Sequence, residues 1–104
     1  MNTSQRAFTA LGDATRRIIF EKLQRGPLAV AEIAAGLPVS RPAVSQHLKV
    51  LREAKLISIS SRGTKNIYQV DKEGIIAMRN YLDQCWNEAL ENFKRLAEKT
   101  EKNK

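Results

Sequence analysis

Apolar residues recur at helical spacing in four early segments, alternate with polar residues in two short segments, and return to helical spacing near the end. The spacing predicts helices over about 4–11, 14–25 and 30–35, and a fourth from Ser40 onward. The alternation over 56–61 and 66–70 predicts a hairpin, and a long final helix follows over about 73–99. The expected fold class is therefore mainly α with a small β-hairpin (α+β).

Residues that end or begin helices separate these segments. We expect Gly12 to end the first helix as a left-handed C-terminal residue, and Asp13 to cap the second. Gly26-Pro27 and Pro38 stop the second and third helices. Ser40 can accept a bond from a free N–H of the fourth helix, so that helix should begin there.

The apolar faces indicate what packs inward. The residues predicted to face the core are Ile18, Ile19 and Leu23 in the second helix, Ile33 and Ala34 in the third, and Val44, Leu48 and Leu51 in the fourth. The last helix carries an apolar stripe at Ile75, Met78, Leu82, Cys85, Ala89, Phe93 and Leu96. The last stripe exceeds what so small a core can cover. It therefore predicts an interface with something outside the domain.

The charge balance favours an anionic partner. The chain has 18 Lys and Arg against 11 acidic residues, for a net charge of +7. Residues 40–66 alone hold six basic residues and one acidic residue, which gives them +5. Charge alone is compatible with nucleic acid, with an anionic membrane surface, or with a merely solvated basic face on a small α+β domain.

Two helices joined by a tight turn, the second with small polar and basic outward residues, are typical of a helix-turn-helix. Ser45 and Gln46 suit hydrogen bonds to base edges, whereas Arg41 suits either guanine or a phosphate. Arg62 and Lys65 at the hairpin tip suit a wing against the DNA backbone or an adjacent minor groove. The predicted DNA-binding residues are Arg41, Ser45, Gln46, His47, Lys49, Arg52, Arg62 and Lys65.

The sequence resembles the ArsR/SmtB-type winged helix-turn-helix repressors over nearly its whole length. Three stretches carry the resemblance: Leu11-Gly12-Asp13-Ala14-Thr15-Arg16-Arg17-Ile18 at the start, Ser40 to Leu51 continuing through Arg52-Glu53-Ala54-Lys55-Leu56-Ile57, and Arg62-Gly63 through Tyr68. They are similar to the family's opening motif, recognition helix and wing.

The resemblance implies a single domain, residues 1–104, that forms a homodimer, binds a palindromic operator in double-stranded DNA and represses transcription. The DNA-binding core would span 12–71 with a wing at 57–70, and the helices over 4–11 and 73–99 would form the dimer interface. The interface residues expected on this basis are Phe8, Leu11, Met78, Leu82, Cys85, Trp86, Ala89 and Phe93.

Many members of that family sense metals through a cysteine pair on the third helix or through His and acidic ligands on the last helix. This chain has Leu28-Ala29-Val30-Ala31 where the cysteine pair would fall, and no histidine in its last helix. Zinc and similar ions are usually coordinated by at least one Cys or His side chain. We therefore expect no metal and no cofactor, and the chain is more similar to the metal-independent SdpR-like branch.

Two lone residues carry sharper hypotheses. His47, between Gln46 and Leu48, is expected to touch phosphate or to pack at the DNA-facing edge; in the first case its protonation strengthens binding at mildly acidic pH. Cys85 on the apolar stripe is expected to be a small buried hydrophobe. The alternative for Cys85 is a redox switch that pairs it with its mate across the dimer.

Other function classes find less support. One His and one Cys, no glycine-rich phosphate loop and no clustered carboxylates argue against an enzyme. A winged-helix module that binds a protein or membrane partner is the stronger alternative, and such a partner would also be one way to relieve repression. With no apolar run near 20 residues and no signal-peptide pattern, we expect a cytoplasmic protein.

Overall fold

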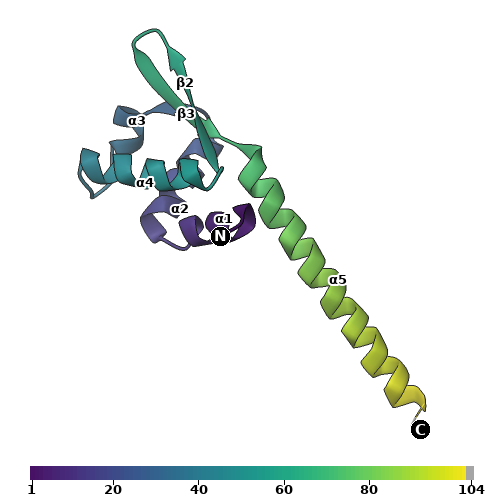
Figure 1. Cartoon of the computed structure of the whole chain (residues 1–104). Helices are drawn as coiled ribbons and strands as arrows, with labels where there is room; N and C mark the ends of the chain where they lie inside the picture. Colours follow the sequence, from purple (N-terminus) through teal and green to yellow (C-terminus); the bar gives the residue numbers. More distant parts are fainter. Residues whose placement is uncertain (103–104) are drawn as a thin grey trace.

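The computed structural model describes residues 1–102, with side chains placed through residue 100. Five helices and three strands follow one another as α1 Thr3–Leu11, α2 Ala14–Gln24, β1 Leu28–Ala29, α3 Val30–Ala34, α4 Arg41–Glu53, β2 Ile57–Arg62, β3 Lys65–Val70 and α5 Lys72–Lys102. The predicted order of four helices, a hairpin and a last helix is confirmed (Figure 1). The short strand β1 was not expected.

The sheet is antiparallel with strand order β1-β3-β2. In the hairpin, Ile57 pairs with Val70 and Arg62 with Lys65, which leaves a two-residue turn at Gly63 and Thr64. Gly63 has a φ of 63°, as a type II′ turn requires at its first central position. The hairpin extends away from the helices as a wing (Figure 1).

The core lies between α1, α2, α3, α4 and the base of the hairpin. Its largest fully buried side chains are Ile19, Ile33, Val44, Leu48, Leu51, Leu56 and Ile57. The prediction for Ile18 is wrong, because 46% of this residue is exposed. Successive helical residues lie about 100° apart, so Ile19, Phe20 and Leu23 share the buried face of α2, and Ile18 lies beyond the edge of that face.

The junction between α1 and α2 is held by side chains. Asp13 caps α2 as predicted, because its carboxylate accepts from the Arg16 N–H at 2.9 Å. The prediction for Gly12 is wrong: its φ is −69°, in the right-handed region. The last carbonyls of α1 are satisfied by arginines instead, since Arg16 Nε donates to Ala10 O at 2.8 Å and Arg17 Nε to Leu11 O at 3.1 Å.

Helix α4 begins and ends with defined caps. Ser40 Oγ accepts from the Ala43 N–H at 3.3 Å, which confirms the predicted start. At the other end Lys55 adopts a φ of 61°, while the Leu56 N–H donates to Leu51 O at 3.1 Å and the Lys55 N–H to Arg52 O at 3.0 Å. This is a Schellman motif with lysine where glycine is usual.

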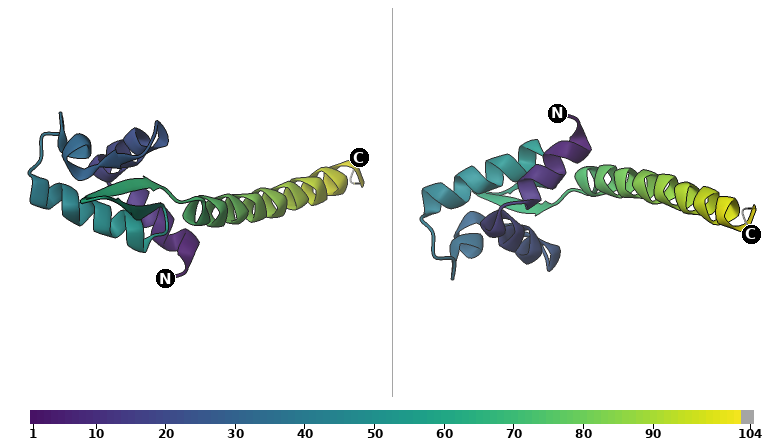
Figure 2. Two further views of the ribbon diagram at one scale, coloured as in Figure 1. Left: turned by 90° about the horizontal axis from the view of Figure 1, so that it is seen from above. Right: turned by 90° about the horizontal axis from the view of Figure 1, so that it is seen from below.

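Helix α5 is attached to this same turn and then leaves the domain. The Gly74 N–H donates to Lys55 O at 2.7 Å, and the Asp71 N–H donates to Leu56 O at 2.9 Å. Near the start of α5, Tyr81 meets Phe8 of α1 edge-on, with ring centroids 5.6 Å apart. Beyond that point α5 projects away from the rest of the chain (Figures 1 and 2).

Candidate nucleic-acid interface

Helices α3 and α4 are joined by the turn over 35–40 and form the two helices of the predicted helix-turn-helix. Lys22 of α2 secures the end of α3, since its Nζ donates to Ile33 O at 3.2 Å and to Ala35 O at 2.8 Å. Gly36 then takes a φ of 80°, which lets the chain reverse toward Ser40. Lys22 therefore holds the end of α3 from which the turn departs, and Ser40 caps the start of α4.

The face of α4 turned away from the core is polar and basic. Because Val44, Leu48 and Leu51 are fully buried, the residues on the opposite side are held toward solvent. The predicted binding residues that are exposed there are Arg41, Ser45, Gln46, Lys49 and Arg52. The structure thus brings five of the eight predicted residues together on one helix face.

The wing contributes two more. Arg62 and Lys65 form the last residue pair before the turn, and both are exposed. Lys65, Thr64 and Asn66 share an open groove of about 420 Å³ with Arg41 and Ser45 of α4. The tip of the wing and the N-terminal half of α4 therefore border the same groove.

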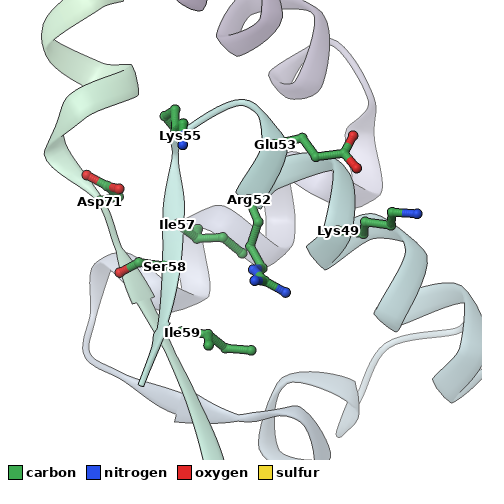
Figure 3. A pocket seen from close by; sticks show the side chains of 8 residues that line it. All are labelled: Lys49, Arg52, Glu53, Lys55, Ile57, Ser58, Ile59 and Asp71. Carbon is green, nitrogen blue, oxygen red and sulfur yellow. The ribbon is translucent and has the colours of Figure 1, made fainter. Parts of the chain in front are cut away.

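A second groove lies between the C-terminal half of α4 and β2, with a volume of about 580 Å³ (Figure 3). In Figure 3 the side chains of Ile57 and Ile59 extend from β2 toward Arg52 on α4. Lys49 and Lys55 add two further cations to the lining, while Glu53 and Asp71 add two carboxylates. The basic row of α4 thus continues beside the wing to the end of the helix.

The six cations of this surface are Arg41, Lys49, Arg52, Lys55, Arg62 and Lys65, which we call the basic face. Over the part of the chain that the structure describes, none of them lies within 4.0 Å of a carboxylate oxygen. Their charges are therefore not neutralised within the domain. A polyanion that lies along α4 and the wing would therefore meet cations that are still free to pair.

His47 lies differently from the other predicted residues. Its side chain is half-buried, and its Nδ1 lies 4.0 Å from Asp13 Oδ2 at the start of α2. The hydrogen bond from the Arg16 N–H lowers the pKa of Asp13 below its ordinary value, and the nearby charges of Arg16 and His47 act in the same direction. The ring of His47 thus faces the domain's own carboxylate.

The predicted interface residues are divided between two environments. Phe8, Leu11 and Met78 are half-buried where α1 packs against the start of α5. Farther along α5, Leu82, Cys85, Trp86, Ala89 and Phe93 are exposed, Trp86 and Phe93 by more than two thirds of their surface. Cys85 is thus exposed in the single chain, and its expected burial stays a prediction for the dimer. The neighbouring Cys85 thiol raises the pKa of the Tyr81 hydroxyl.

Residues 1–102 contain neither a metal-binding cluster nor a membrane-spanning helix. Over that range no cluster of three His, Cys, Asp or Glu side chains is arranged to hold a metal ion. None of the helices there is both long and apolar enough to cross a membrane.

Four residues that hold helix ends in place were not predicted in that role from the sequence. Arg16, Arg17 and Lys22 each donate to a helix-terminal carbonyl, although in the sequence Arg16 and Arg17 appeared only as part of a motif and Lys22 only as a charge. Gly74 is buried against the end of α4, and a glycine within a helical pattern was the available signal.

Comparison with known proteins agrees with this geometry. The family described as "Bacterial regulatory protein, arsR family" matches residues 13–58, which run from the α2 cap to the start of the wing. The HTH-type transcriptional regulator Rv2034 of Mycobacterium tuberculosis is 54% identical over 91 residues, covering 88% of this chain and 85% of that protein. The transcriptional repressor SdpR of Bacillus subtilis is 31% identical over 85 residues, covering 78% and 94%.

Among solved structures, an ArsR-like transcriptional regulator from Rhodococcus sp. RHA1 superposes with a TM-score of 0.77 at 28% identity, covering 91% of this chain and 92% of that one. The matches thus include the hairpin and much of α5 as well as the helix-turn-helix. This chain belongs to the ArsR family of bacterial regulatory proteins and is a winged helix-turn-helix, DNA-binding transcriptional regulator.

Proposed function

We propose that this protein is a homodimeric repressor that binds a palindromic operator, with α4 in the major groove and the wing on the adjacent backbone or minor groove. The observation that carries the proposal is the basic face, whose six cations have no carboxylate partner within the described residues. The name of the relative SdpR, a transcriptional repressor, supports the direction of regulation. The proposal assigns the protein no catalytic reaction, no cofactor and no metal, and places it in the cytoplasm.

The exposed residues of α4 divide into two roles. Gln46 and Ser45 are the proposed base-reading residues, because their side chains offer both donors and acceptors to base edges. Lys49, Arg52 and the wing residues are proposed phosphate contacts. Arg41 borders the groove shared with the wing tip and suits either role. His47 faces Asp13 in the free protein, so a contact of His47 with DNA requires its ring to turn outward.

Selection from a random duplex pool at physiological salt tests the proposal most directly. The selected sequences should contain two inverted half-sites whose centres lie about 10 base pairs, or a multiple of that, apart. A pool that stays random would contradict sequence-specific binding. A single half-site without its inverted copy would contradict the dimeric arrangement.

Salt dependence provides a second, independent test. If the dimer contacts at least about six phosphates, the plot of log affinity against log salt concentration should have a slope near −5 or steeper. Specific operator should be preferred over random duplex by several orders of magnitude. A shallow slope would indicate that the basic face does not lie on the backbone.

The dimer is proposed to form through α1 and α5, whose apolar residues together would form one interface on each protomer. The stripe on α5 remains exposed in the single chain, and a large contiguous apolar surface of this kind marks an interaction site. The proposed arrangement keeps 12–71 as the DNA-binding core and uses 4–11 and 73–99 for association.

A pair of charges on the stripe tests this interface. Leu82→Glu combined with Trp86→Glu should give a monomer in sedimentation velocity, because burying two carboxylates in an apolar interface is strongly unfavourable. Gln84→Glu, on the opposite side of α5, is the matched control and should remain a dimer. If the double variant sediments like the control, α5 is not the interface.

A further inference from the structure

A third open groove lies on the other side of α4, away from the wing. Helix α1 runs beside α4 there, as both views in Figure 2 show. The groove has a volume of about 450 Å³, and its lining includes Arg6 and Thr9 of α1 and Val50 and Glu53 of α4. It shares Glu53 with the groove beside β2, but none of its other lining residues belongs to the interface described so far.

Arg6 is the cation of this groove, and the structure gives it no partner. Its side chain is exposed, and among the described residues it donates no side-chain hydrogen bond and has no carboxylate oxygen within 4.0 Å. The neighbouring arginines differ, because Arg16 and Arg17 are both engaged with the last carbonyls of α1. Arg6 is therefore available for a ligand outside the domain.

The groove borders the exposed strip of α4 that carries Lys49. Glu53 belongs to its lining, and Glu53 lies four residues after Lys49, one turn along the same exposed strip of α4. A duplex that contacts Lys49 would therefore pass close to the rim on which Arg6 lies.

We propose that Arg6 binds a backbone phosphate of the same duplex, on the side of α4 opposite the wing. This inference rests on the proposed function and enlarges the binding surface from two elements to three, in the order wing, α4, α1. A guanidinium matches a phosphate well because it can donate two parallel hydrogen bonds. Each dimer would gain two such contacts.

Glu53 is the acidic residue of the same groove and acts against such a contact. It faces the phosphate from α4 while Arg6 faces it from α1. Replacing Glu53 by Gln should therefore strengthen binding to any duplex, whereas replacing Arg6 by Gln should weaken it. The opposite signs follow from charge, because both side chains are exposed and neither packs in the core.

The experiment measures operator and random-duplex affinity of the full chain between 50 and 200 mM salt. For Arg6→Gln, loss of two phosphate contacts per dimer should lower the magnitude of the log–log slope by about 1.8. The ratio of wild-type to variant affinity should then shrink roughly tenfold over that range. Arg25→Gln, the same charge change at the end of α2, is the matched control and should leave the slope unchanged.

Three results distinguish a phosphate contact of Arg6 from other roles of this residue. A slope for Arg6→Gln equal to that of Arg25→Gln overturns the proposal, and so does a loss confined to the specific operator. Arg6→Lys, which keeps the charge, should restore most of the slope; failure to do so assigns Arg6 a structural role and also overturns it. If the wild-type protein itself binds no duplex, the proposed function fails, and that result is distinct from a defect seen in Arg6→Gln alone.

Discussion

Gly74 lies where the dimer helix meets the end of the DNA-reading helix, and its replacement by Ala tests that junction. A Cβ built on Gly74 would lie 2.6 Å from Lys55 O and 2.8 Å from both Ala54 O and Lys55 C. All three atoms belong to the backbone, so they cannot move aside as a flexible side chain would. The Gly74 N–H also donates to Lys55 O at 2.7 Å, and this bond would have to lengthen.

The expected loss of stability combines three effects. Overpacking of this kind costs about 1–3 kcal/mol. Weakening a backbone hydrogen bond costs a further ~1 kcal/mol. The higher helix propensity of alanine offsets up to about 1 kcal/mol of this loss, and offsets less in the first turn of a helix. Gly74→Ala should therefore lower the free energy of unfolding by about 2 kcal/mol.

Urea unfolding followed by circular dichroism at a fixed protomer concentration measures this loss. Gly12→Ala is the matched control: Gly12 has a right-handed φ, and its Cβ would lie 3.2 Å from Thr9 O, a tight contact but a longer one than any of the three at Gly74. The control should therefore stay within about 1 kcal/mol of wild type. A Gly74→Ala protein as stable as the control would show that α5 does not rest on the end of α4.

Three further predictions follow from single residues. Lys55→Gly should raise the free energy of unfolding by about 1 kcal/mol, because glycine adopts the left-handed φ at the end of α4 without strain. The same variant should bind duplex DNA more weakly, because it removes one cation from the basic face. Asp13→Ala should lower the thermal midpoint more than Asp13→Asn does, because asparagine keeps the cap. Folding lowers the pKa of Asp13 from 3.8, so its carboxylate stabilises the folded protein above pH 3.8. The higher thermal midpoint of wild type relative to Asp13→Asn should therefore disappear as the pH falls through the lowered pKa. Gln46→Ala should cost about 1–3 kcal/mol on the selected operator and relax base preference, whereas Lys65→Gln should weaken all duplexes alike in fluorescence anisotropy titrations.

Features that depend on neighbouring residues were predictable from the sequence. Asp13 and Ser40 cap helices through N–H groups three residues away, so their roles follow from position alone. Val44, Leu48 and Leu51 are fully buried as their helical spacing indicates. The concentration of charge over residues 40–66 likewise gave the location of the basic face.

Features that depend on distant parts of the chain were not predictable in this way. Strand β1 consists of two residues, Leu28 and Ala29, and exists because they pair with Tyr68 and Ile67 some 40 positions later. No alternation can appear in so short a segment. The direction of His47 likewise depends on α2, whose start brings Asp13 to 4.0 Å from its ring.

The long free portion of α5 bears on how long a single protomer would survive in the cell. The chain measures 71 × 26 × 25 Å, with a radius of gyration of 19.2 Å, whereas a compact domain of this length would have about 13 Å. A helix without packing is marginal in water, so its distal turns would open readily in a lone protomer and present a site for proteases. Association would close that site. Degradation would then fall mainly on unpaired protomers, and the cellular level of the regulator would follow the pool of assembled dimers.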